Sequence, residues 1–304
     1  MSDYSHLNPD IKNFTLQASK KDRIDFLYEP LWINYPKSEE TIQLLSELMN
    51  RPKRPRMQNL LIIGEANMGK TSLVTEFAKM YPDTSIEDNE GMTSVQKHVL
   101  LANLIGNDEK DLYISILEKM WSRFSPTESK AKLRHQVLYL MRECNVKILI
   151  LDEIHNLLSG TASKQRIIMN TIKNLSNELM IPIVGVGTQD ASMILVSDPQ
   201  HASRFDVVRL SKWSMNKEFG GMLYAFERNL PLRKASLLHK KEKAILLYNI
   251  SSGNLGNLHR LIIECAKYAI EEGIEEISLE IIEKFKWVKP TDTRSARELS
   301  FDTH

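Results

Sequence analysis

The chain has 304 residues, of which 42% are hydrophobic and 26% are charged, and its formal net charge is +1. This ordinary globular composition is long enough for one large domain or two average ones. A near-neutral chain does not attract nucleic acid through its overall field, so any contact with DNA must come from a local basic surface.

The cysteines and the N-terminal residues predict in which cellular compartment the protein lies. Cys144 and Cys265 lie far apart in helical patterns, and we expect buried thiols in a reducing compartment without a disulfide or metal framework. The opening residues lack the basic-then-apolar pattern of a signal peptide, and no apolar run approaches the roughly 20 residues that span a bilayer. These features predict a cytoplasmic protein.

The first two thirds of the chain alternate between strand and helix patterns. A polar N-terminal extension over residues 1–40 precedes a helix expected over 38–50. Near-continuous apolar runs, typical of parallel strands covered on both faces, predict five strands. They lie at 59–63, about 98–104, 146–151, 182–187 and 206–210, with helical patterns between them at 70–80, 111–123, 129–143 and 164–180. We therefore predict an α/β core over 41–211, with a parallel five-stranded sheet flanked by helices.

The last third shows helical spacing only. Helices are expected near 215–228, 239–250, 256–272 and 278–286. They predict a small helical lid over 212–289, followed by a polar, flexible tail over 290–304.

The stretch Gly64–Thr71 reads G-x-x-x-x-G-K-T between an apolar run and a helical pattern, the context that a phosphate-binding loop requires. Glycines let successive backbone N–H groups face the phosphates at a helix N-terminus. Lys70 should reach the β- and γ-phosphates of ATP, and the Thr71 hydroxyl should bind Mg²⁺. The predicted nucleotide-binding residues are Gly64, Glu65, Ala66, Asn67, Met68, Gly69, Lys70, Thr71 and Ser72.

Two carboxylates, Asp152 and Glu153, end the third predicted strand. Phosphoryl transfer depends mainly on positioning and charge stabilisation. We expect Asp152 to hold the Mg²⁺ shell and Glu153 to polarise the attacking water. An Asp-Glu pair can also merely cap a helix, but together with the phosphate loop it predicts a nucleotide hydrolase.

Two further polar positions follow or precede strands of the predicted sheet. Thr188, after the fourth strand, is the predicted sensor of the γ-phosphate, with Gln189 as second candidate and a simple turn as the alternative. Arg204, before the fifth strand, is a candidate arginine finger for a neighbouring subunit. Arg209 competes for that role, and a plain surface arginine is the alternative.

The remaining candidates are basic side chains. Arg260, in the helix that follows the glycines of 253–256, is a candidate nucleotide sensor of the lid or a solvated arginine. For DNA, Lys130 and Arg134 share one helical face, with Lys132 on another, and Arg51, Lys53, Arg54 and Arg56 form a second cluster. Both groups are also compatible with a solvated surface, and no interleaved aromatic residues indicate base stacking.

Together these motifs resemble those of AAA+ P-loop ATPases, and more narrowly those of the TniB family of transposon ATPases, which are relatives of TnsC and MuB. The segments on which this resemblance rests span roughly residues 30–270, and the first two are specific to the TniB family. They are Leu31–Lys37, Arg56–Gly64, Asn67–Thr71, Leu149–His155, Val184–Thr188 and Ser203–Phe205.

The resemblance implies an ATP-dependent regulator of transposition that oligomerises on double-stranded target DNA as a ring or helical filament. It implies recruitment of a DDE transposase of the TniA or TnsB type and a link to a target-selection protein of the TniQ type. This chain has Asn257 where relatives often carry Arg or Glu, which leaves the assignment of Arg260 open. Two alternatives remain: an AAA+ initiator or loader with another DNA client, and an ATP-dependent scaffold with negligible turnover.

Overall fold

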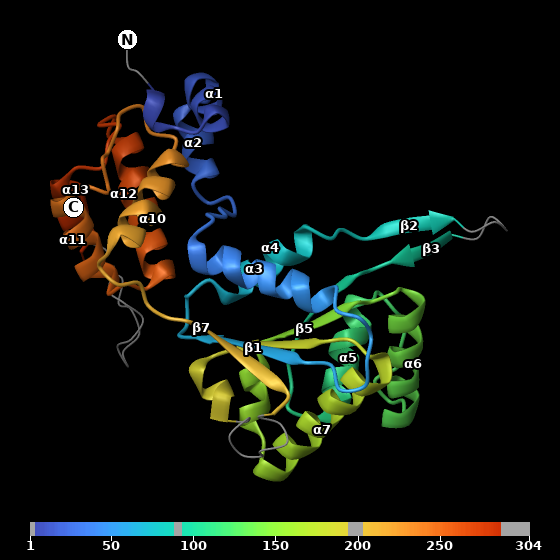
Figure 1. Ribbon diagram of the computed structural model, residues 1–304. Helices are drawn as coiled ribbons and strands as arrows, with labels where there is room; N and C mark the ends of the chain where they lie inside the picture. Colours follow the sequence, from blue (N-terminus) through green and yellow to red (C-terminus); the bar gives the residue numbers. More distant parts are fainter. Residues whose placement is uncertain (1–3, 88–92, 194–202, 287–304) are drawn as a thin grey trace. The chain divides into compact units, whose positions relative to one another are not determined.

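The computed structural model describes residues 4–87, 93–193 and 203–286 (Figure 1). The chain forms two compact units. The sheet unit comprises Pro36–Glu65 and Gly69–Leu210, and the helical unit comprises Met1–Tyr35, Ala66–Met68 and Ser211–His304.

The sheet unit contains a five-stranded sheet with the order β4-β5-β6-β1-β7. Its strands are β1 (Asn59–Gly64), β4 (Val99–Asn103), β5 (Ile148–Asp152), β6 (Ile183–Gly187) and β7 (Phe205–Leu210). All four neighbouring pairs are parallel. Because β1, β5 and β6 are buried along their whole length, they carry apolar residues on both faces. The predicted fold class is confirmed.

Helices cover both faces of this sheet. Figure 1 shows α5 (Glu109–Lys119), α6 (Lys130–Glu143) and α7 (Ala162–Leu179) on one face, and α3 (Pro36–Met49) and α4 (Lys70–Lys79) on the other. The first face has a continuous apolar core that includes Leu149, Ile116 and Ile172. Two short 3₁₀ helices, η2 (Ile154–Ser159) and η3 (Gln189–Ala191), follow β5 and β6. This arrangement leaves the ends of the strands available for functional side chains.

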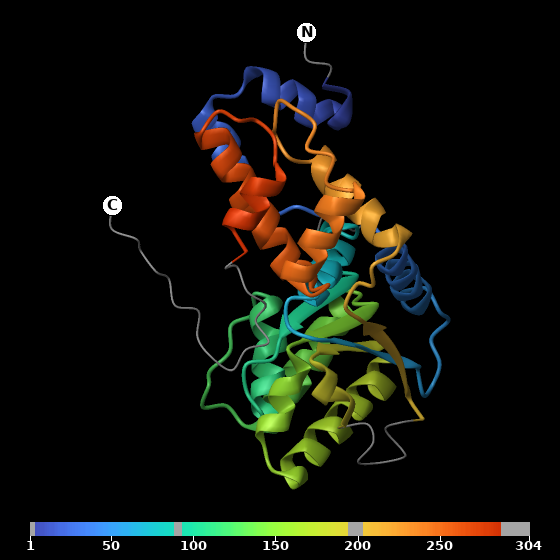
Figure 2. The same ribbon diagram turned by 90° about the vertical axis from the view of Figure 1, so that its left-hand side faces the viewer.

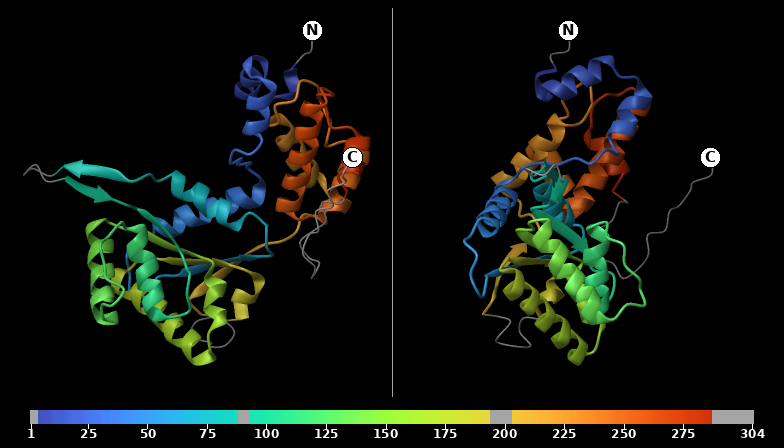
Figure 3. Two further views of the ribbon diagram at one scale, coloured as in Figure 1. Left: turned by 180° about the vertical axis from the view of Figure 1, so that it is seen from behind. Right: turned by 90° about the vertical axis from the view of Figure 1, so that its right-hand side faces the viewer.

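A second, two-stranded sheet was not predicted. Strands β2 (Thr84–Glu87) and β3 (Thr93–Gln96) pair antiparallel, with Ser85 opposite Val95. Figure 3 shows this hairpin extending away from the five-stranded sheet. All four residues of β2 are exposed, so the hairpin lacks the alternation of apolar and polar residues that reveals a half-buried strand.

The helical unit contains α10 (Lys217–Arg228), α11 (Lys241–Ser251), α12 (Leu255–Glu271) and α13 (Leu279–Lys284). Their apolar faces share one core. Asn254 caps α12 and Ser278 caps α13, each accepting a hydrogen bond from a backbone N–H in the first turn. The structure has all four helices that the spacing predicts for this part of the chain.

The N-terminal segment is more ordered than its mixed composition suggests. It forms η1 (Tyr4–His6), α1 (Pro9–Gln17) and α2 (Lys20–Phe26), and α2 packs against α12 (Figure 2). Arg23 is 1% exposed and forms two hydrogen bonds to the carboxylate of Glu275, at 2.7 and 2.8 Å. Within the helical unit, this buried ion pair connects α2 to the segment that follows α12.

The cysteines differ from each other. Cys265 is buried, whereas Cys144, at the end of α6, is only partly buried, which corrects the expectation that both thiols are buried. No helix among residues 4–87, 93–193 and 203–286 is long and apolar enough to cross a membrane. The predicted tail over 290–304 lies outside the described residues.

Candidate active site

The phosphate-binding loop connects β1 to α4. Two of its residues have left-handed backbone conformations, Asn67 with φ 62° and Gly69 with φ 76°. Gly64 has no room for a side chain, because a Cβ atom there would lie 2.5 Å from the Leu210 carbonyl oxygen. The loop ends at Lys70, where the N-terminus of α4 presents free backbone N–H groups. This geometry suits an anion.

Lys70 points back onto the loop. Its ammonium group donates hydrogen bonds to the carbonyl oxygens of Gly64, at 3.0 Å, and Glu65, at 2.7 Å. Burial lowers the pKa of Lys70, while the negative charges of Glu153 and Asp152 oppose that shift. A partly desolvated ammonium close to two carboxylates gains from an additional anion such as a phosphate.

Thr71 and Asp152 meet across the loop. The Thr71 hydroxyl donates a 2.7 Å hydrogen bond to the Asp152 carboxylate, and Asp152 is only 2% exposed. These two oxygen groups fit Mg²⁺, which prefers oxygen ligands and usually keeps water or substrate phosphates as the others. Among the described residues, no cluster of three His, Cys, Asp or Glu side chains is arranged for a metal. The ion would therefore depend on nucleotide phosphates for further ligands.

Glu153 follows β5 in a left-handed conformation, with φ 57° and ψ 35°. A non-glycine residue there costs free energy, and such strain is common at functional sites. The backbone N–H of Glu153 donates to Asp152 at 2.8 Å, which fixes the peptide between the two acids. The Glu153 side chain is exposed, and its carboxylate lies 3.1 Å from Nε2 of His155.

His155 was not among the predicted site residues. The only indication in the sequence is that His155 lies two residues after Glu153. The left-handed turn at Glu153 brings the two side chains into contact. Sequence spacing alone does not reveal that contact, because it depends on the conformation at Glu153.

Thr188 follows β6, the strand between β5 and β1. The register pairs Gly187 with Ile63, so Thr188 comes level with Gly64 at the carboxyl edge of the sheet. Its side chain makes no capping hydrogen bond to η3, while its carbonyl accepts a bond from Ala191. The neighbouring Gln189 is exposed. The sensor role of Thr188 stays a prediction.

Arg204 lies at the opposite edge of the sheet. It precedes β7, and the register pairs Phe205 with Asn59, the first residue of β1. Arg204 lies one residue before that pair, so six residues at about 3.3 Å each separate its level from Gly64, roughly 20 Å along the strands. The guanidinium donates a 3.0 Å hydrogen bond to Asn177 on α7. Arg209, by contrast, is exposed on β7 and level with Ile63, near the phosphate loop.

Within the helical unit, the first turn of α12 contacts the loop residues Ala66–Met68. Asn254 donates to the Ala66 carbonyl at 2.9 Å, and the Gly256 N–H donates to the Asn67 carbonyl at 2.8 Å. A Cβ atom on Gly256 would lie 2.7 Å from that of Asn67. Neither Asn254 nor Gly256 was predicted as a site residue. Arg260 is exposed on the same helix, and its sensor role stays a prediction.

The first DNA-binding candidates already have acidic neighbours. Lys130 lies 3.0 Å from Asp108, Lys132 lies 2.7 Å from Glu128, and Arg134 forms an ion pair with Glu178. Their role in DNA binding stays a prediction.

Comparisons with known proteins agree with the geometry. The family model described as Bacterial TniB protein matches residues 23–215. A comparison with curated proteins gave no match.

Solved structures with a similar fold include three archaeal proteins. Cdc6p from Pyrobaculum aerophilum has 18% identity and a TM-score of 0.61, covering 87% of this chain and 70% of its own. The Aeropyrum pernix ORC2 protein, solved as ADPNP–ADP complexes, has 15% identity and a TM-score of 0.61, covering 87% and 71%. The Aeropyrum pernix ORC1 protein in complex with DNA has 14% identity and a TM-score of 0.55, covering 86% and 68%.

At these identities the likeness shows the fold alone, which this chain shares with Cdc6p and the two ORC proteins. The family match rests on the sequence and covers more than half of the chain. The protein therefore belongs to the TniB family.

Proposed function

We propose that this protein is an ATPase that regulates DNA transposition. In the ATP-bound state its subunits oligomerise on double-stranded target DNA and recruit a DDE transposase of the TniA or TnsB type. A target-selection protein of the TniQ type is the expected second partner, and hydrolysis of ATP disassembles the oligomer. Membership of the TniB family supports the role in DNA transposition. The geometry of the site supports ATP hydrolysis.

The observation that carries the chemistry is the convergence of Lys70, Thr71 and Asp152 at the phosphate loop. Lys70 would neutralise phosphate charge, and Thr71 and Asp152 would provide oxygen ligands to Mg²⁺. That ion would supply positive charge to offset the negative charge that develops during phosphoryl transfer. Glu153, exposed beside this pair, is the base that accepts a proton from the attacking water.

Arg204 is assigned to the neighbouring subunit's site. Its place at the amino edge of the sheet, about 20 Å from its own phosphate loop along the strands, supports action in trans. A guanidinium that reaches the next subunit's nucleotide would couple hydrolysis to assembly.

A steady-state assay of ATP turnover, with and without duplex DNA, tests the proposal. We expect measurable turnover that DNA increases. Electron microscopy with DNA and a slowly hydrolysed ATP analogue should then show regular oligomers that ADP does not support. Absence of turnover under both conditions would favour the scaffold without hydrolysis.

The second candidate is an AAA+ initiator or loader with another DNA client. It is favoured by the fold likeness to Cdc6p and to ORC1, the latter solved in complex with DNA. Pull-down with a transposase of the same element separates the two functions, because a loader would not retain it in an ATP-dependent way.

A further inference from the structure

A basic hollow lies at the amino edge of the five-stranded sheet, at the opposite ends of the strands from the phosphate loop. Three segments form it: the loop before β1, the turn before β5 and the turn before β6. Its polar and charged lining consists of Asn50, Arg51, Lys53, Asn145 and Lys147, with Met180 among the apolar residues. We call the hollow that these residues line the amino-edge hollow.

The cations of the hollow have different surroundings from the lysines of α6. Among the described residues, none of Arg51, Lys53 and Lys147 has an ion pair, whereas Lys130 and Lys132 each lie within 3.0 Å of a carboxylate. The charge of Lys147 acts on His98, whose pKa is lowered by burial and further by that charge. Within the described residues, no carboxylate holds these three cations in place.

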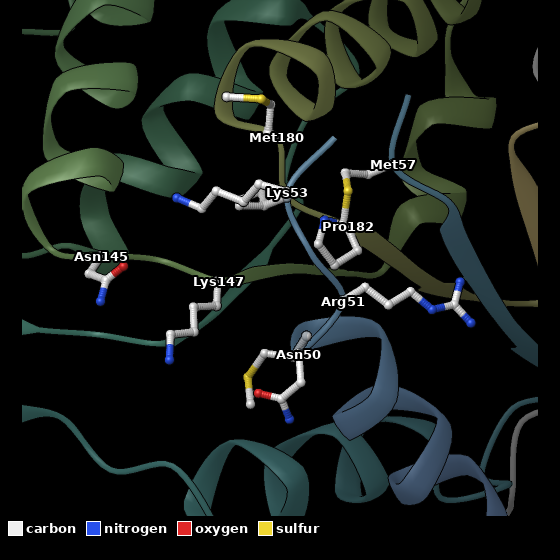
Figure 4. A pocket seen from close by; sticks show the side chains of 10 residues that line it. Asn50, Arg51, Lys53, Met57, Asn145, Lys147, Met180 and Pro182 are labelled. Atoms are coloured by element: carbon white, nitrogen blue, oxygen red, sulfur yellow. The ribbon is translucent and has the colours of Figure 1, made fainter. Parts of the chain in front are cut away.

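A close view shows how these side chains are arranged (Figure 4). Lys53 and Lys147 extend toward the side of the hollow where Asn145 lies, and Arg51 extends toward the opposite side. The three cations are therefore spread over two sides of the hollow and do not form one compact group of charges.

Helices α3, α6 and α7 also end at this edge, and their last carbonyl groups attract cations. Arg142 serves this purpose, because it donates a 3.3 Å hydrogen bond to the Glu178 carbonyl. Within the described parts of the chain, Arg51, Lys53 and Lys147 make no such side-chain bond. Their side-chain ammonium and guanidinium groups can therefore donate to a ligand.

We propose that the amino-edge hollow binds the phosphate backbone of double-stranded DNA through Lys53, Lys147 and Arg51. No aromatic residue lines the hollow, so it offers no stacking platform for bases. Ammonium and guanidinium groups instead suit phosphate oxygens, which carry no sequence information. This inference rests on the proposed action on DNA and names the surface that makes the contact.

The main competitor is an acidic protein segment. A phosphate backbone, with a charge at every step, matches cations that extend toward opposite sides of the hollow better than isolated carboxylates on flexible side chains do. Phosphate contacts also release condensed counterions, which gives a distinctive dependence on salt.

The test compares two double variants with the same change in charge, K53A/K147A and the control K130A/K132A. Binding of the full-length protein to a labelled random-sequence duplex is measured by fluorescence anisotropy with a slowly hydrolysed ATP analogue, at several salt concentrations. For K53A/K147A we expect about tenfold weaker binding at 0.1 M salt. The slope of log affinity against log salt should become shallower by about 1.8.

The control variant should keep the wild-type slope, and both variants should keep wild-type ATP turnover without DNA and an unchanged circular dichroism spectrum. An unchanged slope for K53A/K147A, or an equal change in both variants, would overturn the inference. So would competition by polyglutamate as strong as that by duplex DNA of equal charge. Failure of the wild type itself to bind DNA would instead contradict the proposed function.

Discussion

The two units use their ionic groups in contrasting ways. In the sheet unit, Lys70 and Glu153 remain partly or fully exposed at the carboxyl edge, close to each other but available to a ligand. In the helical unit, Arg23 and Glu275 are buried and form an ion pair with each other. We therefore expect changes to the exposed charges of the site to reduce activity with little effect on stability. Changes to the buried ion pair should reduce stability with little effect on activity.

The largest expected effect tests the first half of this contrast. Lys70→Ala should abolish nucleotide-dependent assembly and reduce ATP turnover at least ~100-fold, because no other loop side chain neutralises the β- and γ-phosphates. Nucleotide affinity and electron microscopy on DNA measure the loss. The control is Lys79→Ala, which removes an exposed lysine from the other end of the same helix. Wild-type oligomers formed by the Lys70 variant would contradict the phosphate-loop assignment.

Glu153→Gln separates binding from hydrolysis. The amide keeps the shape of the side chain but does not accept a proton, so turnover should fall by about 10²–10⁴-fold while ATP binding persists. Assemblies on DNA should then last longer than those of the wild type. Glu118→Gln, a change at an exposed site on α5, is the matched control. Unchanged turnover would move the catalytic role to another residue.

Arg23→Ala tests the other half of the contrast. Removing one member of a buried ion pair leaves the Glu275 carboxylate without its partner and should cost about 3–5 kcal/mol of stability. Denaturant unfolding measures this loss, with exposed Lys21→Ala on the same helix as control. Because Arg23 does not belong to the phosphate loop, the residual folded protein should still bind ATP. Loss of nucleotide binding with unchanged stability would break the contrast.

Arg204→Ala should act between subunits. The variant should bind ATP normally and lose the DNA-stimulated part of hydrolysis, a reduction of about tenfold or more. Mixed with Glu153→Gln, it should recover part of that activity where an intact site meets an intact Arg204. Arg209→Ala is the discriminating control, because Arg209 lies level with the phosphate loop of its own subunit. No recovery in mixtures shown to co-assemble would indicate that Arg204 works in cis or only supports the fold.

The smallest effect is the pH dependence of the buried pair. Burial alone would raise the pKa of Glu275, but the hydrogen bonds and charge of Arg23, with help from Arg233, outweigh it and lower that pKa. The pair therefore stabilises the fold above the unfolded-state pKa of about 4.3, and this contribution is lost as pH falls through the lower folded-state value. Thermal unfolding between pH 7 and pH 3 should show the wild type losing stability relative to Glu275→Gln. A constant difference would exclude this linkage.

Local patterns predicted most of the sheet unit. Strands β1, β5 and β6 were evident because residues buried on both faces must be apolar throughout, and α4 was evident from the motif that opens it. The hairpin of β2 and β3 escaped prediction because its short strands pair only with each other and β2 buries nothing.

What the sequence determined by itself was therefore what neighbouring residues decide: the five strands, the helices between them, and the phosphate loop with its following helix. The tertiary structure decided which distant groups meet. It brought Arg23 to Glu275, placed Arg204 at the edge opposite the loop, and gathered Lys53 and Lys147 in one hollow. The physical reason is that hydrophobic periodicity and turn chemistry act over a few residues. The partner of a charge depends instead on strand order and helix packing between segments more than ninety residues apart.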